Sequence, residues 1–207
     1  MRRSVINGLA ALLGGGILLQ LALAGGAEAA EAAWVARING APSITRAGKT
    51  EPLRRGDTVA IGDVVTTGDA AKVKLLLDDD SVLTIGPRTQ VTIDELLLEP
   101  AGRTGRLRVL FGRFKLSVAA WLTGPSDYEV HTPTAVAGVR GTILWGDTEL
   151  DTICALEGTV EVRTLRGGAV ATLAGGHCVT KMGRGATEPL VPSREELQRY
   201  LKEVTLD

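Results

Sequence analysis

The stretch Val130–Thr142 reads VHTPTAVAGVRGT, and it says more about the fold than any other part of the chain. A threonine-proline step comes first, a run of small residues follows, and an Arg-Gly-Thr corner ends the stretch. The segments ILW at 143–145 and ALEGTVEV at 155–162 come next, the second broken at a glycine. This order is typical of short β-strands joined by tight turns, in which glycine supplies the positive φ angles. None of these residues is arranged as a catalytic set.

The same kind of unit recurs along the chain from Trp34 onward: an alternating apolar and polar run, a turn at Gly or Asp, and a second run. The clearest examples are Val73–Ile85, Leu107–Val118, Thr152–Val162 and Ala171–Met182, with turns at Asp80, Gly112, Gly158 and Gly176. Period-two alternation indicates strands with one buried and one wet face. Because the intervals between units lie close to multiples of a constant length, the sequence predicts an all-β fold of short stacked strands, either β-solenoid-like or a sandwich, over residues 34–182.

The end of the chain is different, and a linker over 183–192 is expected to lead into an amphipathic helix over 193–205. Ser193 and Glu196 form a capping-box pattern directly after Pro192. Apolar residues then fall at helical spacing, at Leu197, Tyr200, Leu201 and Val204. This face is expected either to dock on the β domain of the same chain or to bind a partner protein.

Residues 1–29 have the pattern of an export signal. Arg2 and Arg3 are followed by an apolar region that ends in Ile17–Ala24, and Ala27-Glu28-Ala29 is a small-residue cleavage site. Cleavage near Ala29 predicts a periplasmic or secreted protein. The alternative is an uncleaved anchor, which would be the only link to the membrane.

Charge and composition exclude some partners. Removal of residues 1–29 takes away Arg2, Arg3 and Glu28, which leaves 21 of 23 basic and 23 of 24 acidic residues and a formal charge of −2. Nucleic-acid binding is not expected, because it calls for a strongly basic face. Aromatic residues make up only 3% of the chain, which argues against a sugar-stacking surface.

Cys154 and Cys178 are the two cysteines, and an even pair in an exported chain favours a disulfide. Both lie in short strand-like segments that would be neighbours in a stacked β fold. Their Cα atoms are expected within the roughly 4.4–6.8 Å that disulfides span. The alternative is two buried thiols that pack as small apolar groups.

No catalytic, cofactor or metal site is expected. The chain has two histidines and no G-x-S-x-G motif. His177 and Cys178 are adjacent in a predicted strand and point to opposite faces, so they cannot easily share one zinc ion with His131 and Cys154. The acidic run Asp78–Ser81 lacks the spacing of a calcium loop and is interpreted as a solvated turn.

Arg140, Gly141 and Thr142 are predicted to form a structural corner. Arg140 stands in an otherwise uncharged stretch from Ala135 to Trp145. Its guanidinium is therefore expected to lie on the inner side of the strands, paired with a carboxylate such as Glu157 or Glu161. A role in receiving a ligand or a partner is the alternative.

From about Ala36 to Met182 the chain resembles the FecR-like periplasmic domain family. The resemblance rests on GDTVAIGDVVTTGDAAKVKLLLDDDSVLTIGPRTQVTI, on VLFGRFKLSV, on the TPTAVAGVRGT corner, and on LEGTVEV and LAGGHCVTKM. Asp80 replaces the glycine usual before Ser81, and His177 replaces a common glutamine. FecR-type regulators also carry a cytoplasmic anti-sigma segment, a membrane span and a small α/β module that meets an outer-membrane transporter. In this sequence we expect an export signal in place of the anti-sigma segment, and we expect the tail after Met182 to be too short for the α/β module.

The resemblance therefore implies a stand-alone exported module that is not an enzyme and needs no cofactor. It would act in protein interaction, signalling or sensing, with another envelope protein as partner, such as a membrane signalling protein or a transporter. Two alternatives stay open: an envelope module that binds a small molecule or glycan, and a structural scaffold of a secreted assembly.

Overall fold

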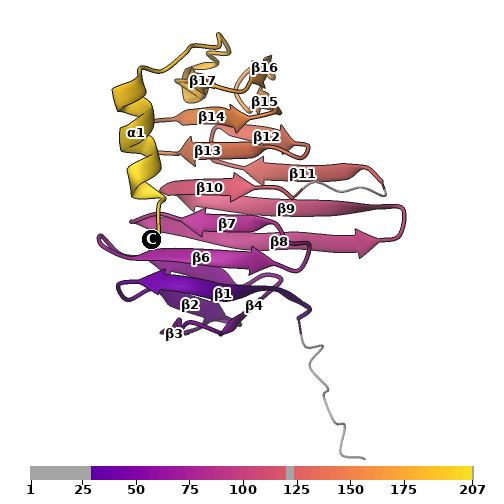
Figure 1. Ribbon diagram of the computed structural model, residues 1–207, viewed down its shortest axis with the longest axis vertical. Coiled ribbons are helices and arrows are strands. Elements are labelled where there is room, and N and C mark those ends of the chain that lie inside the picture. Colours follow the sequence, from indigo (N-terminus) through magenta and orange to yellow (C-terminus); the bar gives the residue numbers. More distant parts are fainter. Residues whose placement is uncertain (1–28, 120–123, 207) are drawn as a thin grey trace, which may run out of the picture.

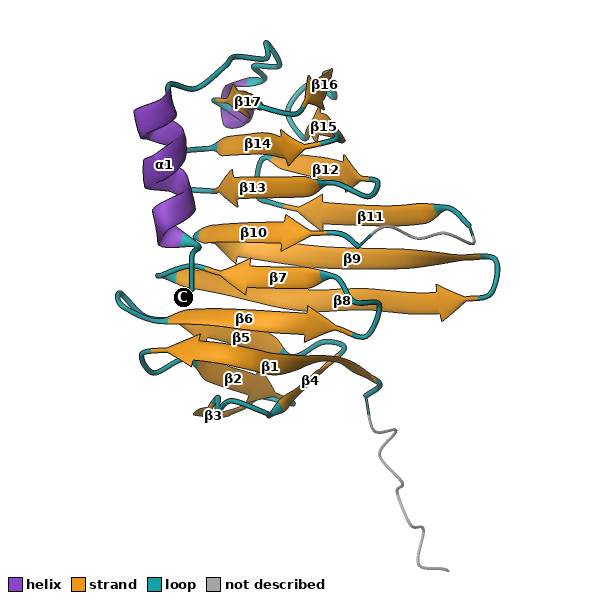
Figure 2. Cartoon of the chain, viewed as in Figure 1, coloured by secondary structure: helices purple, strands orange, loops and turns teal. Residues whose placement is uncertain are grey.

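The computed structural model describes residues 29–119 and 124–206, which form two large β-sheets stacked one behind the other and a single helix near the C-terminus (Figure 1). Strands dominate and the helix lies at one end of them, so the expectation of an all-β fold with a short C-terminal helix is confirmed (Figure 2). The expected signal peptide lies outside the described residues, apart from Ala29.

The first sheet, called sheet A, is antiparallel throughout. In spatial order its described strands are β17 (His177–Thr180), β14 (Thr152–Glu157), β13 (Ile143–Asp147), β10 (Arg113–Ser117), β7 (Val82–Ile85), β6 (Lys72–Leu77), β1 (Glu31–Asn39) and β4 (Thr58–Ala60).

The second sheet, called sheet B, contains one parallel pair, β9 with β11. In spatial order its described strands are β16 (Val170–Ala174), β15 (Thr159–Thr164), β12 (Ala135–Val139), β11 (Ser126–His131), β9 (Gly102–Phe111), β8 (Thr89–Glu99), β5 (Val64–Thr67), β2 (Ser43–Arg46) and β3 (Lys49–Pro52). The hairpin β8–β9 is the longest in the molecule and extends past the strands of sheet A (Figure 1).

Of the two architectures expected, the solenoid is wrong and the stacked pair of sheets is right. Hairpins alternate between the sheets along the chain. The β6–β7 hairpin lies in sheet A and β8–β9 in sheet B, and later β13–β14 lies in sheet A and β15–β16 in sheet B. The tight turn at Asp80 reverses the chain, so β6 and β7, which it joins, are antiparallel neighbours. A solenoid requires parallel neighbours, which tight reversals cannot give. The regular spacing in the sequence reflects the exchange between sheets.

The core lies between the two sheets, and strands such as β6 and β15 contribute alternate residues to it. On β6, Val73, Leu75 and Leu77 are buried while their neighbours face outward. On β15, Val160 and Val162 are buried, whereas Glu161 and Arg163, which alternate with them, are exposed, as the alternation predicts. Each large aliphatic side chain buried in this way contributes roughly 1.5–3 kcal/mol.

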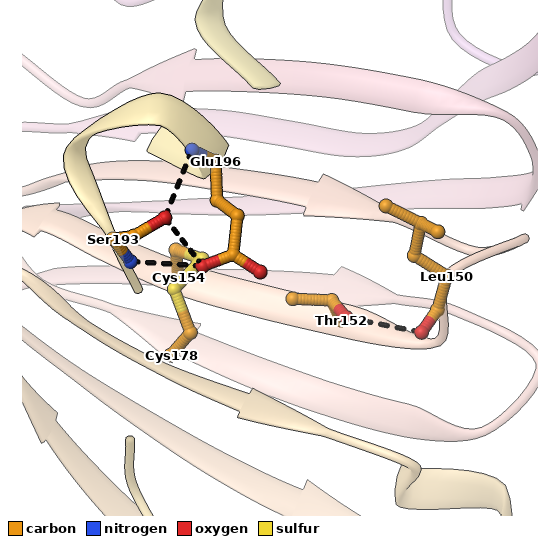
Figure 3. The surroundings of a disulfide bond; sticks show 6 residues. All are labelled: Leu150, Thr152, Cys154, Cys178, Ser193 and Glu196. Carbon is orange, nitrogen blue, oxygen red and sulfur yellow. Dashed lines mark hydrogen bonds between the residues drawn. A yellow bond between two sulfur atoms is a disulfide. The ribbon is translucent and has the colours of Figure 1, made fainter. Parts of the chain in front are cut away.

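After sheet A the chain forms a short 3-10 helix, η1 (Met182–Arg184), and then α1 (Arg194–Glu203). The segment before α1 is tied to the sheet, because Leu190 exchanges backbone hydrogen bonds with Cys178 at 2.8 Å. Ser193 caps α1, and the predicted capping box is present in both directions (Figure 3). Among the described residues, no helix has the length and apolar character needed to cross a membrane.

Candidate interaction surface

The Arg-Gly-Thr corner connects β12 of sheet B to β13 of sheet A. Gly141 has φ +57°, a left-handed conformation that glycine adopts without strain. Thr142 is buried and packs over Gly158, where a Cβ atom would come within 2.4 Å of the Thr142 methyl carbon. These contacts explain why small residues occur at the turn.

The prediction that Arg140 is buried and paired with a carboxylate is wrong. Arg140 is exposed and has no ion pair with any described residue. The apolar residues before it belong to β12, whose inward positions are filled by Ala135, Ala137 and Val139. Arg140 is the first residue past the end of that strand, so its side chain leaves the core side and reaches solvent.

Arg140 lies on a groove of about 580 Å³ on the outer face of sheet B, on the side turned away from the core. The floor of the groove lacks side chains at Gly138, where a Cβ atom would have only the Glu161 carbonyl oxygen within 4 Å, at 3.8 Å. Charged side chains line the groove, at Asp127, Glu129, Arg140, Glu161 and Arg163.

The charges on this face fall into two groups. Across β8, β9 and β11 they are paired: Arg106 lies 2.7 Å from Glu95, and Glu129 lies 2.7 Å from His131. The hydrogen bond from His131 is the main reason that the pKa of Glu129 lies below its ordinary value. Around the groove, by contrast, Asp127, Arg140, Glu161 and Arg163 form no ion pair with the described residues.

A second hollow of about 360 Å³ adjoins the first at the tip of the β8–β9 hairpin. Asp127 and Arg140 line both hollows, so the two are continuous. Leu97 lines the second hollow with half of its surface exposed, and Pro125 lies on the same wall. We call this combined area the corner surface. It joins an apolar end to a groove lined by charges of both signs.

Among the described residues, the buried arginine is Arg103, near the tip of the same hairpin. Its guanidinium and the Asp79 carboxylate are both fully buried, with 2.5 Å between Nη1 and Oδ2. Tyr128 and Ser81 donate hydroxyl hydrogen bonds to the same carboxylate oxygen, and Arg103 also donates to the Ala119 carbonyl and, at 2.9 Å, to Ser126 Oγ. Burial is the main cause that raises the pKa of Tyr128 far above its ordinary value, and the Asp79 carboxylate is the second. The Tyr128 hydroxyl therefore stays protonated.

One expectation is corrected by this buried cluster. The run Asp78–Ser81 is not a fully solvated turn, because Asp79 and Ser81 are buried and only the tip, Asp80 with φ +66°, adopts the left-handed turn conformation. In the sequence, the feature that points to this buried cluster is Gly105, because a Cβ atom at that position would lie 2.3 Å from the Tyr128 ring.

The disulfide between Cys154 and Cys178 is present, as the sequence predicts (Figure 3). The two residues lie directly opposite each other on β14 and β17. The Cα separation of 3.9 Å is shorter than the expected range. Cys178 directs its backbone hydrogen bonds to Leu190, so the cysteines form a non-hydrogen-bonded pair, in which opposing Cα atoms approach most closely.

Helix α1 packs on its own sheet. Tyr200 stacks on Trp145 with ring centroids 4.3 Å apart, and Val204 is buried in a small cluster with Trp145 and the disulfide. Leu197 and Leu201 are half-buried. Of the four residues predicted as a possible partner-binding face, Tyr200 and Val204 contact the chain's own β domain.

The described residues contain no group of three His, Cys, Asp or Glu side chains able to hold a metal ion. Both cysteines are in the disulfide. What the fold defines is an all-β domain of two stacked sheets with the grooved corner surface at one side.

The chain belongs to the FecR family, whose description is "FecR protein" and which matches residues 63–170. This match covers the strands from β5 to the start of β16, including the corner and the Asp79–Arg103 cluster. The resemblance seen in the sequence is confirmed. A search of curated proteins finds no match.

Two crystal structures of a candidate anti-sigma factor from Parabacteroides distasonis ATCC 8503 have the same fold. The structure at 1.65 Å resolution is 15% identical, with a TM-score of 0.52, and the match covers 67% of this chain and 64% of that one. The structure at 2.50 Å is 14% identical, with a TM-score of 0.54, and the match covers 67% and 63%. The chain therefore spans less than two thirds of the length of these structures, and the likeness concerns the fold.

Proposed function

We propose that this chain is an exported, non-catalytic FecR module that binds another envelope protein through the corner surface and acts in signalling or sensing. The observation that carries this proposal is the group of charges at Asp127, Arg140, Glu161 and Arg163. They form no ion pair among the described residues, and Asp127 and Arg140 also line the hollow that contains the exposed Leu97. A periplasmic location agrees with the disulfide, which persists in oxidising compartments.

The buried cluster beneath this surface supports a binding role. Arg103 joins β9 to the turn at Asp79 in sheet A and to Ser126 at the start of β11. The strands that carry Leu97 and Asp127 are therefore held in fixed positions before a partner arrives. Such preorganisation lowers the entropic cost of binding.

A partner protein fits the surface better than a glycan does. The lining of both hollows contains no aromatic ring, whereas sugar recognition commonly uses stacking on aromatic faces. Unpaired charges of both signs instead suit a protein surface with complementary charges, which would give specificity and a faster association rate.

Site-specific photo-crosslinking in the native host tests this proposal. A photoreactive residue at Arg140 should form an adduct with one envelope protein, while the same residue at Arg166, an exposed arginine in the β15–β16 turn, should not. Asp127→Lys should then abolish the adduct at position 140. Identical adducts at both positions, or none at Arg140, would overturn the proposal.

A further inference from the structure

A second surface, on the opposite side of the molecule, is basic. A groove of about 840 Å³ lies between the C-terminal part of α1 and the ends of β1 and β6. Among the described residues, its charged lining residues are Arg37, Arg55, Lys72 and Lys202, and none is acidic. The whole chain has a formal net charge of only −1, so this concentration of cations is local.

The cations continue along the outer face of sheet A. Arg37 on β1 lies directly opposite Lys74 on β6, and Lys74 lies opposite Thr84, which in turn lies opposite Lys115. Like charges placed directly opposite on neighbouring strands are destabilising. None of Arg37, Lys74 and Lys115 has an ion pair in the described part of the chain. On sheet B, by contrast, opposing arginines and carboxylates neutralise each other.

A direct link joins the two walls of the groove. Lys72 donates hydrogen bonds to the carbonyl oxygens of Lys202 at 2.7 Å and Thr205 at 3.1 Å. A cation at the C-terminal end of a helix is favourable, because the last carbonyl groups carry partial negative charge. This contact fixes the end of α1 to β6 and leaves Arg37, Arg55 and Lys202 exposed.

We propose that this basic groove binds an extended acidic segment of a protein partner. The cations match carboxylate side chains, and the half-buried Ile38, Leu201 and Leu206 give the groove apolar contact points. A concave groove with apolar walls suits a peptide of mixed acidic and apolar residues, whereas a lipid surface would meet a flat or convex face. The volume lies in the range of roughly 300–1,000 Å³ that is usual for binding clefts.

Fluorescence anisotropy with a labelled peptide of alternating Glu and Leu tests the proposal on the folded protein. Wild type should bind the peptide at about 10 mM salt and bind more weakly at about 300 mM. The double variant Arg37→Glu/Arg55→Glu should lose at least about tenfold in affinity. The matched control Arg166→Glu/Arg184→Glu changes the net charge equally but lies outside the groove, and it should bind within about twofold of wild type.

Folding of the variants is checked by thermal melting. Arg37→Glu should not lower the melting temperature, because it replaces a like-charge pair with an opposite-charge pair across from Lys74. The proposal is overturned if wild type does not bind the peptide, or if both double variants lose affinity equally. Binding to phosphatidylglycerol vesicles without binding to the peptide would also overturn it and indicate a membrane surface. Since Arg140 is intact in all variants, the outcome is independent of the corner surface.

Discussion

At the scale of single residues, two arginines that look alike in the sequence differ in burial and in charge pairing. Both stand beside glycine, Arg103 after Gly102 and Arg140 before Gly141. Arg103 points between the sheets and is paired with Asp79, while Arg140 lies past the end of its strand and is exposed. A buried charge must be paired and an exposed one need not be, so the first holds the fold together and the second can serve binding.

Replacing each arginine should therefore have opposite consequences. Arg103→Ala leaves the Asp79 carboxylate buried without its cation and should cost about 3–5 kcal/mol of unfolding free energy. Arg140→Ala should stay within about 0.5 kcal/mol of wild type, as exposed substitutions do. Urea denaturation of both variants measures the difference. Equal losses would show that our assignment of the buried and the exposed arginine is wrong.

Glu129 should make stability depend on pH. Its pKa is lowered in the folded state, mainly by the hydrogen bond with His131, so its contribution is present above the unfolded pKa of about 4.3 and is lost as the pH falls through the lower folded value. Glu129→Gln should therefore be less stable than wild type near pH 6, by less than about 1 kcal/mol because the pair is partly exposed. Urea melts near pH 3 should show the gap closing. A gap that persists there would contradict the ionic explanation.

At the scale of elements, the last part of the chain is fastened to sheet A by several different contacts. The disulfide joins β14 to β17, Leu190 bridges to Cys178, and Tyr200 of α1 stacks on Trp145 in β13. The outer faces of β13, β14 and β17 are thereby covered by the chain's own helix. This packing explains why an amphipathic helix is present although the β core lies on the other side of the sheet.

Removal of the disulfide should loosen this end of the molecule. Cys154→Ala/Cys178→Ala opens a loop with a sequence separation of 24 residues and should cost about 3 kcal/mol on the chain-entropy account. Denaturant unfolding of the variant, compared with wild type in reductant, measures the loss. The variant and the reduced wild type should have the same free energy of unfolding. A variant as stable as oxidised wild type would show that the bond contributes little.

At the scale of the whole molecule, the two sheets carry different outer surfaces. Sheet B has a mixed-charge face that ends in the corner surface, and sheet A has a positive face beside α1. The proposed partners approach from opposite sides, so both sites could be filled at once.

Export is the prediction that concerns the entire chain. The apolar region followed by Ala27-Glu28-Ala29 predicts removal of about the first 29 residues. Intact-mass measurement of protein recovered from the periplasm should show this loss, to within a few residues. Recovery of the full-length chain from membranes alone would contradict cleavage and favour an anchor.

Local patterns in the sequence were sufficient for the fold class, the C-terminal helix and the disulfide. Alternation on β6 and β15, the capping box at Ser193 and Glu196, and the cysteines in neighbouring late strands are all read within a few residues. The same alternation could not choose between a solenoid and two stacked sheets. Both place every second residue inside, and they differ only in strand direction and in long-range pairing.

Which residues form strands, where the chain turns and how it ends can be predicted from the sequence alone. Which charges are buried cannot, because burial depends on how distant segments pack together. Arg103 and Asp79 are 24 residues apart and lie in different sheets, so no local pattern could pair them. The exposure of Arg140, and the gathering of Arg37, Lys72 and Lys202 around one groove, likewise depend on where β12 ends and where α1 docks. The physical reason is that burial and charge pairing depend on which elements pack against each other, whereas turns and periodicity depend on residues that are neighbours along the chain.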